Sequence, residues 1–360
     1  MRAAVAEGGR IAVRELAEPA PGPGEALLAV LACGVCGSDL HHFAGRAADA
    51  APLVYGHEFA AEVLAYGPGA SGPAPGTRVC AVPQAGGEIV GLSERYPGGF
   101  GERLVVAADM LVPIPDHVPT GQAALTEPLA VGAHAVAAAG LTPGPQAGAA
   151  PGSSASAAAP AGGGRDVALV VGCGPIGLAV LAGLKAEAPH VPVIAADLSP
   201  ARRALASRMG ADEVVDPAAA DPYGHLAAYG VDTAMGAGSL RTGARSHAVI
   251  FECVGVPGML QKVFEGAPPK ARVVVAGACM EPDTVVPVLA VVKELRLSFV
   301  FGYTHEEFTR TLAAIAAGTV DPAPMITADV GLDGVAEAFT ALADPERHVK
   351  ILVRPWEGAA

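Results

Sequence analysis

One cysteine, one histidine and two glutamates stand out in this sequence because their side chains can bind a metal ion. Cys36 opens the motif CGSDLH, His57 and Glu58 form part of GHE, and Glu127 lies in TEP, much further along the chain. Each of them alone would more often be structural or solvent-exposed. Together they supply a thiolate, an imidazole and carboxylates, the ligand types of a Zn²⁺ site that keeps one coordination position open. We therefore predict a catalytic zinc ion bound by Cys36, His57 and Glu127.

The charges of this ligand set favour chemistry on an alcohol. The Cys36 thiolate and the Glu127 carboxylate would balance the charge of Zn²⁺ while His57 stays neutral. A nearly neutral shell can accept an alkoxide without a large excess of negative charge in a buried cleft. The ion would lower the pKa of the bound alcohol and polarise a carbonyl group in the reverse direction. Glu58 is the alternative ligand, exchanging with water, or a catalytic group that supports the ligands from outside.

Two side chains near Cys36 could carry a proton from the substrate to solvent. Ser38 and His41 follow Cys36 by two and five positions, within a turn or two of the metal. A hydroxyl beside the alkoxide and an imidazole nearer the solvent would form a proton path. His42 is the competing candidate for the outer position.

A glycine-rich turn predicts a dinucleotide site. The sequence GCGPIG fits G-x-G-x-x-G, follows the apolar run VALVV and opens a helical segment, which is the context that the motif requires. The first glycine permits a tight turn, the second lets the backbone approach the pyrophosphate, and the third allows the helix to pack closely on the strand. The helix N-terminus offers free N–H groups to the phosphates. The predicted cofactor-binding residues of this turn are Gly172, Gly174, Pro175, Ile176 and Gly177.

The residue that ends the next strand favours NAD over NADP. Asp197 lies where a carboxylate should hydrogen-bond the adenosine ribose hydroxyls, and the same carboxylate would repel a 2′-phosphate. Arg202 and Arg203 lie close by in the sequence and could offset part of this preference. We count Arg202 among the predicted cofactor-binding residues.

The elements around these motifs predict an α/β chain in two parts. Short apolar runs between Gly/Pro clusters predict strands at residues 26–31, 60–66 and 103–107. From Asp166 onward, strands alternate with helices, which implies a doubly wound parallel sheet. The predicted elements there are strands at 167–171, 193–197, 247–254 and 271–278, and a helix at 175–187. Residues 141–164 are low-complexity Ala/Gly/Pro/Ser and predict a flexible surface insertion; residues 233–246 predict a further loop.

Composition excludes several classes of protein. The chain has 360 residues, which favours two domains, and a net charge of -13, which argues against nucleic-acid or anionic-membrane partners. No apolar run is long enough for a membrane span, and the charged N-terminus does not fit a signal peptide. We expect a soluble, cytoplasmic protein. Its six scattered cysteines are then expected to be thiols or metal ligands rather than disulfides.

Six motifs in order along the whole chain resemble one family. They are CGVCGSDLHHF, YGHEFAAEV, PGTRV, PGGFGERLVV, ALTEPLAVGAHAV and VVGCGPIGLAV. They are similar to the zinc-containing medium-chain dehydrogenase/reductase superfamily, in its alcohol, polyol and threonine dehydrogenase-like branch. The resemblance implies a GroES-like β-rich catalytic domain at 1–135 and 304–360, a Rossmann domain at 136–303, and an active site in the cleft between them.

The resemblance also implies roles for single residues. Cys36 and His57 would be zinc ligands, Glu127 would take the place of a third ligand, Ser38 would contact the reacting oxygen, and His41 would relay the proton. Members of the family are usually dimers or tetramers joined through Rossmann-domain strands, for which residues 295–303 are the candidate here.

The sequence departs from many zinc members of the family in one respect. These carry a structural-zinc lobe with four closely spaced cysteines, whereas residues 80–100 of this chain hold only Cys80. We therefore predict one catalytic zinc and no structural zinc. Cys33 and Cys36 form a C-x-x-C, but no thioredoxin-like context supports a redox disulfide. The substrate pocket would be walled by loops near residues 43–46, 84–96 and 277–280.

These features together predict a zinc-dependent dehydrogenase that transfers a hydride between an alcohol or polyol, preferably a secondary alcohol, and NAD. One alternative is a zinc-free quinone or enoyl reductase of the same fold, which would have no use for the metal-binding residues. The other is a non-catalytic NAD-binding redox sensor, which fold alone does not exclude.

Overall fold

The computed structural model describes residues 1–47, 49–141, 166–233 and 247–357. The chain divides into two compact units, one formed by Met1–Ala130 with Tyr303–Ala360 and the other by Val131–Gly302. The predicted insertion at 141–164 lies outside the described residues except for Leu141. The predicted loop at 233–246 lies outside them except for Thr233.

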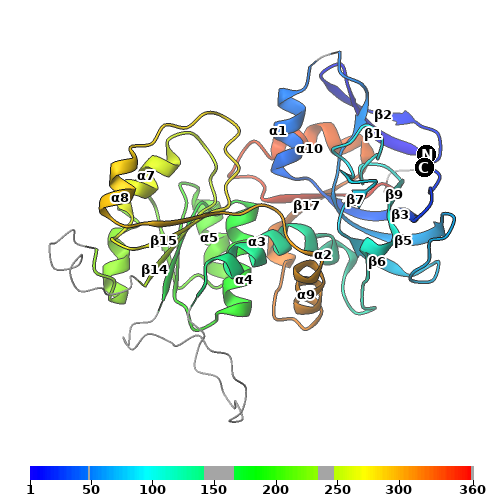
Figure 1. The fold of residues 1–360 in the computed structure, drawn as a ribbon. Coiled ribbons are helices and arrows are strands. Elements are labelled where there is room, and N and C mark those ends of the chain that lie inside the picture. The colour runs from blue at the N-terminus through cyan, green and yellow to red at the C-terminus, as the bar shows by residue number, and fades with distance from the viewer. Residues whose placement is uncertain (48, 142–165, 234–246, 358–360) are drawn as a thin grey trace, which may run out of the picture. The chain divides into compact units, whose positions relative to one another are not determined.

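The first unit is rich in β-structure (Figure 1). Its N-terminal segment contains β1 (Arg2–Glu7), β2 (Arg10–Glu15), β3 (Glu25–Gly34), α1 (Gly37–Gly45), β4 (Leu53–Val54), β5 (Glu58–Tyr66), β6 (Arg78–Ala81), β7 (Gln84–Ala85), β8 (Glu88–Ile89), β9 (Arg103–Ala107), η1 (Ala108–Met110), β10 (Leu111–Pro113), α2 (Thr120–Ala124) and the start of α3 (Thr126–Ala138). Its C-terminal segment contains α9 (His305–Ala316), η3 (Ala323–Met325), β17 (Ile326–Val330), η4 (Leu332–Gly334), α10 (Val335–Ala341) and β18 (Lys350–Val353).

The main sheet of this unit joins the two ends of the chain. Its strand order is β10-β6-β5-β3-β18-β17, and β9 also pairs with β3. β3 has the sequence EALLAVLACG, in which alternate side chains are buried along most of its length, as expected for a strand packed on a core through one face. Its antiparallel pairing with β5 sets Gly34 opposite Glu58, and its pairing with β18 sets Gly34 opposite Leu352. Segments distant in sequence therefore meet at the end of β3.

The second unit is a six-stranded parallel sheet with helices packed against it. Its elements are the rest of α3, β11 (Val167–Val171), α4 (Pro175–Glu187), β12 (Val193–Ala196), α5 (Pro200–Arg208), β13 (Glu213–Val215), η2 (Gly224–Tyr229), β14 (Ala248–Glu252), α7 (Met259–Gly266), β15 (Arg272–Val275), α8 (Pro287–Val292) and β16 (Arg296–Phe299). The strand order is β13-β12-β11-β14-β15-β16. Helix α4 packs against β11 and β14, α5 against β12 and β13, and α7 against β14 (Figure 1). The predicted doubly wound α/β class is confirmed.

Strand ends differ from the sequence-based expectation for identifiable reasons. β3 continues to Gly34, beyond the predicted end at residue 31, and β5 begins at Glu58, before the predicted start at residue 60. The antiparallel hydrogen-bonded pairing of these two strands extends over residues that show no alternating apolar pattern. β14 ends at Glu252, short of the predicted residue 254, because the backbone turns there and the Glu252 side chain accepts hydrogen bonds from the two amides that follow Cys253.

Each unit buries its own hydrophobic core. The first is built around residues such as Leu28, Phe59 and Phe100, and the second around residues such as Leu169 and Ile250. Among the described helices, none is both long enough and apolar enough to cross a lipid bilayer.

Candidate metal and dinucleotide sites

The ends of β3 and β5 bring three metal-binding side chains together. Ligand atoms of Cys36, His57 and Glu58 all lie within 4.8 Å of one another. Cys36 directly precedes α1, and its backbone N–H donates to Asp39 Oδ2 at 3.0 Å, which fixes the start of that helix. His57 follows Gly56, whose φ of +104° and close contact with Cys33 and Phe100 leave no room for a side chain. The local backbone therefore aims a sulfur, an imidazole and a carboxylate at one point.

Asp39, which the sequence reasoning missed, orients the imidazole of His57. It is fully buried, and its Oδ1 lies 3.2 Å from His57 Nδ1. Burial lowers the pKa of His57, but the Asp39 carboxylate and then Cys36 outweigh that effect and raise the pKa well above its ordinary value. The approach of the Asp39 carboxylate to Nδ1 favours Nε2 as the nitrogen that would bind a metal. The available signal was the position of Asp39 within CGSD, beside the predicted ligand.

Lys350 is a second residue that the sequence reasoning missed. Its Nζ donates to both carboxylate oxygens of Glu58 at 2.7 Å and to the carbonyl of Val35 at 3.1 Å. Lys350 and Glu58 are both 0% exposed. Burial lowers the pKa of Lys350, but the nearby Glu58 carboxylate raises that pKa by a larger amount, so the net shift is upward. A lysine in the apolar run VKILV was the only sequence signal for a buried ion pair.

Glu127 lies near this group and is held by a tyrosine. Tyr303 donates its hydroxyl to Glu127 Oε1 at 2.9 Å. Burial raises the pKa of Glu127 to about 7; the charge of His57 lowers that pKa, and the charge of Glu58 raises it. Glu127 therefore senses the charges of the metal-binding group, although its carboxylate is not among the three ligands that lie within 4.8 Å. Tyr303 was not singled out from the sequence as a site residue.

The predicted proton-transfer residues differ in their surroundings. Ser38 is exposed, and its Oγ lies 3.3 Å from His57 Nε2, the ring nitrogen that does not approach Asp39. His41 is exposed as well. In the competing candidate His42, Nδ1 lies 2.9 Å from the hydroxyl oxygen of Tyr55, and the imidazole ring packs edge-on against that tyrosine. One nitrogen of His42 is therefore engaged by the protein.

The glycine-rich turn has the backbone that a dinucleotide site needs. Gly172 has a φ of +91°, in the left-handed region that favours glycine, and a side chain at Gly177 would overlap the carbonyl of Gly172. Gly174 is the N-cap of α4, and Pro175 is its first residue, while Ile176 follows in the first turn. The first amides of α4 are thus available to phosphate oxygens at the carboxyl end of β11.

Asp197 holds this turn as well as ending the second strand. Its Oδ2 accepts a hydrogen bond from the Cys173 amide at 2.7 Å, and its Oδ1 accepts one from the Ser199 amide at 2.8 Å. Arg203 donates to the carbonyls of Asp197 and Leu198 at 2.7 and 2.8 Å. Arg202 instead lies over the turn, with Nη1 3.7 Å from the position of a side chain at Gly174.

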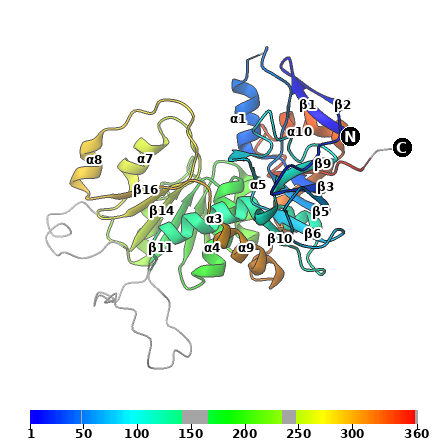
Figure 2. The same cartoon turned by 45° about the vertical axis from the view of Figure 1, so that its right-hand side comes forward.

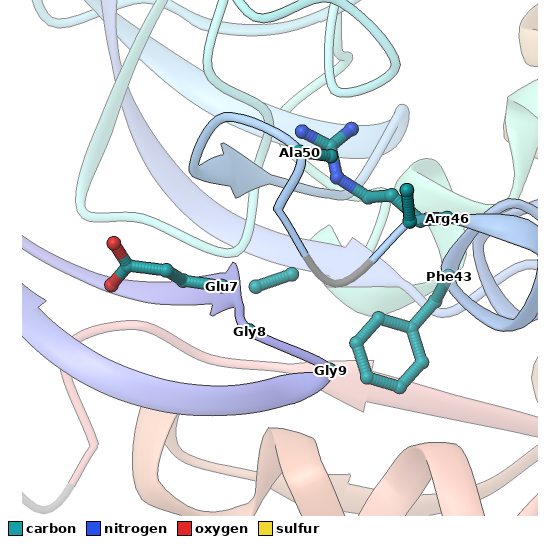
Figure 3. Close-up of a pocket in the computed structure, with 8 residues that line it drawn as sticks. Glu7, Gly8, Gly9, Phe43, Arg46 and Ala50 are labelled. Atoms are coloured by element: carbon teal, nitrogen blue, oxygen red, sulfur yellow. The ribbon is translucent and has the colours of Figure 1, made fainter.

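A shallow pocket elsewhere in the first unit involves one of the predicted pocket walls. The Phe43 ring lies beside Gly9 in the turn between β1 and β2, and the Arg46 side chain points toward Ala50 (Figure 3). The lining residues are Ala6, Glu7, Gly8, Gly9, Phe43, Arg46, Ala47 and Ala50. None of the three clustered metal-binding residues lines it, so this pocket is separate from the metal site.

Known proteins similar to this chain share both units. The alcohol dehydrogenase GroES-like domain matches residues 22–116, and the zinc-binding dehydrogenase domain matches residues 175–317. The (R,R)-butanediol dehydrogenase of Neisseria gonorrhoeae is 31% identical and covers 96% of this chain and 97% of its own. The crystal structure of 2R,3R-butanediol dehydrogenase from Bacillus subtilis has a TM-score of 0.78 at 30% identity, covering 98% of this chain and 99% of its own.

A further solved structure is a zinc-binding dehydrogenase from Sinorhizobium meliloti 1021 bound to NADP. It has a TM-score of 0.76 at 26% identity, and the match covers 98% of this chain and 99% of that one. The family thus includes members that bind a nicotinamide dinucleotide. This chain belongs to the zinc-containing medium-chain dehydrogenase/reductase superfamily, with a GroES-like domain and a Rossmann domain, and is an alcohol or polyol dehydrogenase linked to a nicotinamide dinucleotide.

Proposed function

We propose that this protein oxidises secondary alcohols or diols with NAD, at one zinc ion bound by Cys36, His57 and Glu127. The observation that carries the proposal is the convergence of Cys36, His57 and Glu58 within 4.8 Å, with Glu127 close enough to sense their charges. This donor set fits a borderline-soft divalent ion. The butanediol dehydrogenase relatives support a secondary alcohol as the substrate.

The ion pair with Lys350 favours Glu127 over Glu58 as the third ligand. Both oxygens of Glu58 are already paired with Lys350, and both side chains are fully buried. Moving Glu58 to a metal would leave the ammonium unpaired in the interior, at a cost of several kcal/mol. Glu127 accepts a hydrogen bond from the neutral Tyr303 hydroxyl through Oε1, which leaves Oε2 to serve as a ligand. The charges of the Cys36 thiolate, the Glu127 carboxylate and Zn²⁺ then sum to zero. The neighbouring Glu58–Lys350 ion pair has no net charge either.

The chain's own residues would manage the proton released in the reaction. The zinc ion, when bound, supplies Lewis acidity that lowers the pKa of an alcohol and polarises a carbonyl. Ser38 lies at Nε2 of His57, the nitrogen proposed to bind the metal, and would accept the alcohol proton through its hydroxyl. The exposed His41 would pass that proton to solvent. NAD⁺, when bound, would supply the hydride acceptor, so that a secondary alcohol and NAD⁺ would give a ketone, NADH and a proton.

The environment of Asp197 supports NAD rather than NADP. Each of its carboxylate oxygens accepts one backbone hydrogen bond and retains lone-pair capacity for a ribose hydroxyl. Arg203 is occupied by two carbonyls and by Asp216 at 3.1 Å, so it is not free to neutralise a 2′-phosphate. Arg202 beside Gly174 is better placed to contact the pyrophosphate.

A single zinc ion per chain is part of the proposal. Cys80, the one cysteine in residues 80–100, is buried and donates its thiol to the carbonyl of Ala123 at 3.0 Å. Its burial raises its pKa to about 12, which disfavours the thiolate that a metal would need.

We also propose a homo-oligomer, with a dimer as its unit, formed through β16. This strand is the edge of the six-stranded sheet, and α8 precedes it (Figure 2). Phe299 is 69% exposed, Phe301 is 89% exposed and Val291 of α8 is 70% exposed. Within the described part of the chain β16 pairs with β15 alone, and such a sheet edge with adjacent apolar side chains suits a second copy placed about a two-fold axis.

A cytoplasmic location completes the proposal. All six cysteines are free thiols, and Cys33, Cys80 and Cys173 are buried, as suits a reducing compartment. Subcellular fractionation with an antibody against this chain tests the location, and recovery in a membrane or exported fraction would contradict it.

Metal analysis combined with an NADH absorbance assay tests the enzymatic proposal. Purified protein should contain one zinc per chain and reduce NAD when a secondary alcohol or a diol is added, and chelation should abolish turnover. Cofactor turnover without metal would identify a zinc-free quinone or enoyl reductase instead. Cofactor binding without turnover of any alcohol in a panel would identify a non-catalytic sensor.

A further inference from the structure

Glu252 is a buried carboxylate that neither proposed site uses. It ends β14 and is 3% exposed, and among the described residues it forms no ion pair. Its Oε1 accepts hydrogen bonds from the amides of Val254 at 2.7 Å and Gly255 at 2.9 Å. A buried carboxylate without a cation is costly. The two hydrogen bonds offset part of this cost, but the presence of the carboxylate still needs a structural or functional reason.

The same residue ties together the loops that follow two neighbouring strands. Its backbone carbonyl accepts from the amides of Ala276 and Gly277, both at 2.9 Å, just after β15. A side chain at Gly255 would lie 2.6 Å from the amide nitrogen of Ala278, and one at Gly277 would lie 2.7 Å from Glu252 Oε2. The two loops therefore pack backbone against backbone, with the Glu252 carboxylate beside their contact.

These loops lie next to the glycine-rich turn of the dinucleotide site. The amide of Cys253 donates to the carbonyl of Val171 at 2.9 Å. A side chain at Gly172 would lie 2.7 Å from Val254 Cγ2. In sheets of this kind, ligands bind at the carboxyl ends of the strands where the strand order reverses, and here that point lies between β11 and β14.

The strand order divides the dinucleotide site into two halves. Asp197, the proposed ribose ligand, follows β12 on one side of β11, and the glycine-rich turn for the pyrophosphate follows β11 itself. The rest of an extended dinucleotide must then continue over β14 and β15, on the other side of β11. The loops after β14 and β15, which Glu252 holds together, are thus the surface on which the nicotinamide half of the cofactor would bind.

We propose that Glu252 is a positioning residue for the nicotinamide half of the cofactor site, which rests on the proposed function. Its role is to accept two amide hydrogen bonds in one geometry, so that the loop after β14 keeps its place between the glycine-rich turn and the loop after β15. The requirement is for an acceptor oxygen at the right distance rather than for a negative charge.

Two variants separate the hydrogen-bond acceptor from the charge. Glu252→Gln removes the charge, but its amide oxygen can accept both hydrogen bonds. Glu252→Met keeps a side chain of similar length but removes both the charge and the acceptor oxygen. We expect E252M to bind NADH about tenfold more weakly, as suits the loss of buried hydrogen bonds, and E252Q to bind within about twofold of the wild type. Binding is measured by NADH fluorescence titration of the full-length protein.

Titration with 5′-AMP separates the two halves of the site. AMP should occupy only the Asp197 side, so its affinity should be unchanged in both variants. Glu265 supplies matched controls, because it is an exposed carboxylate on α7 of the same unit. E265M and E265Q should bind both ligands as the wild type does.

The proposal would be overturned by E252Q losing as much NADH affinity as E252M, because the charge would then matter more than the acceptor oxygen. Unchanged NADH binding in E252M, or equal losses of NADH and AMP affinity, would also overturn it. If E252M does not fold, Glu252→Ala, which also lacks the acceptor, is measured in its place against E252Q. A wild-type protein that binds neither ligand would instead contradict the proposed function.

Discussion

The ammonium group of Lys350 contacts both carboxylate oxygens of Glu58 at 2.7 Å, and neither side chain is exposed to solvent. A buried pair of this kind stabilises a fold less than its short distances imply, because both groups lose their hydration. Its larger effect is on the metal site, where it occupies one of the two candidate carboxylates. This pairing makes the choice between Glu58 and Glu127 testable.

Removing one member of that pair should be costly. Lys350→Met leaves Glu58 as an uncompensated buried charge, and we expect a loss of about 3–5 kcal/mol in the free energy of unfolding. The double variant K350M/E58Q should recover much of that loss, since no charge then remains unpaired. Chemical denaturation of the three proteins measures both values. A double variant no more stable than K350M would show that the pair is not the origin of the effect.

The metal assignment predicts a selective loss. Cys36→Ser replaces a thiolate ligand by a neutral hydroxyl and should abolish zinc retention and turnover, while NADH binding on the second unit is retained. Zinc content, alcohol-dependent NAD reduction and NADH fluorescence report these three properties. Cys80→Ser is the matched control, because Cys80 is a thiol outside the metal-binding group and a serine hydroxyl can donate to the same Ala123 carbonyl. Full activity in C36S would contradict the ligand assignment.

The choice of carboxylate predicts unequal effects for two conservative changes. Glu127→Gln should lower the zinc affinity more than Glu58→Gln does, because only Glu127 is proposed to bind the ion directly. Competition with a coloured chelator ranks the two affinities without relying on turnover. The opposite ranking would assign the third ligand to Glu58.

Asp197 should control the cofactor preference. Asp197→Ala removes the acceptor for the ribose hydroxyls and the charge that repels a 2′-phosphate, so NAD should bind more weakly and its advantage over NADP should narrow. The Cys173 amide also loses its partner, so Asp197→Asn, which keeps one acceptor oxygen, is a useful companion. Values of kcat/KM for NAD and NADP measure the change, and an unaltered ratio in both variants counts against the role.

The exposed edge strand predicts a change in assembly. Phe301→Asp places a charge in the apolar surface beside β16 and should shift the protein toward monomers. Light scattering after size-exclusion chromatography measures the mass, and Trp356→Asp, at a half-exposed aromatic residue of the other unit, is the control. A wild type that is already monomeric would rule out the proposed interface.

Local features of this protein could be read from the sequence. The turn Gly172–Gly177 is short, and its glycines are required by backbone conformation and close approach, which neighbouring residues largely determine. The strand VALVV and the helix Pro175–Glu187 carry their own hydrophobic and capping signals, and both lie where they were predicted. The residue types at Cys36 and His57 likewise indicated zinc, because a thiolate and an imidazole are ligands that this ion prefers.

Tertiary structure alone decided which groups control those ligands. Lys350 meets Glu58 across 292 positions of sequence, and Tyr303 meets Glu127 across 176. No local pattern encodes such contacts. The Lys350–Glu58 pair forms because β18 pairs with β3 and β3 pairs with β5, whereas Tyr303, just before α9, reaches Glu127 in the first turn of α3. Sequence thus determined the chemical inventory and the nucleotide turn through local backbone preferences. The partners of Glu58 and Glu127 were decided by long-range packing and the burial that follows from it.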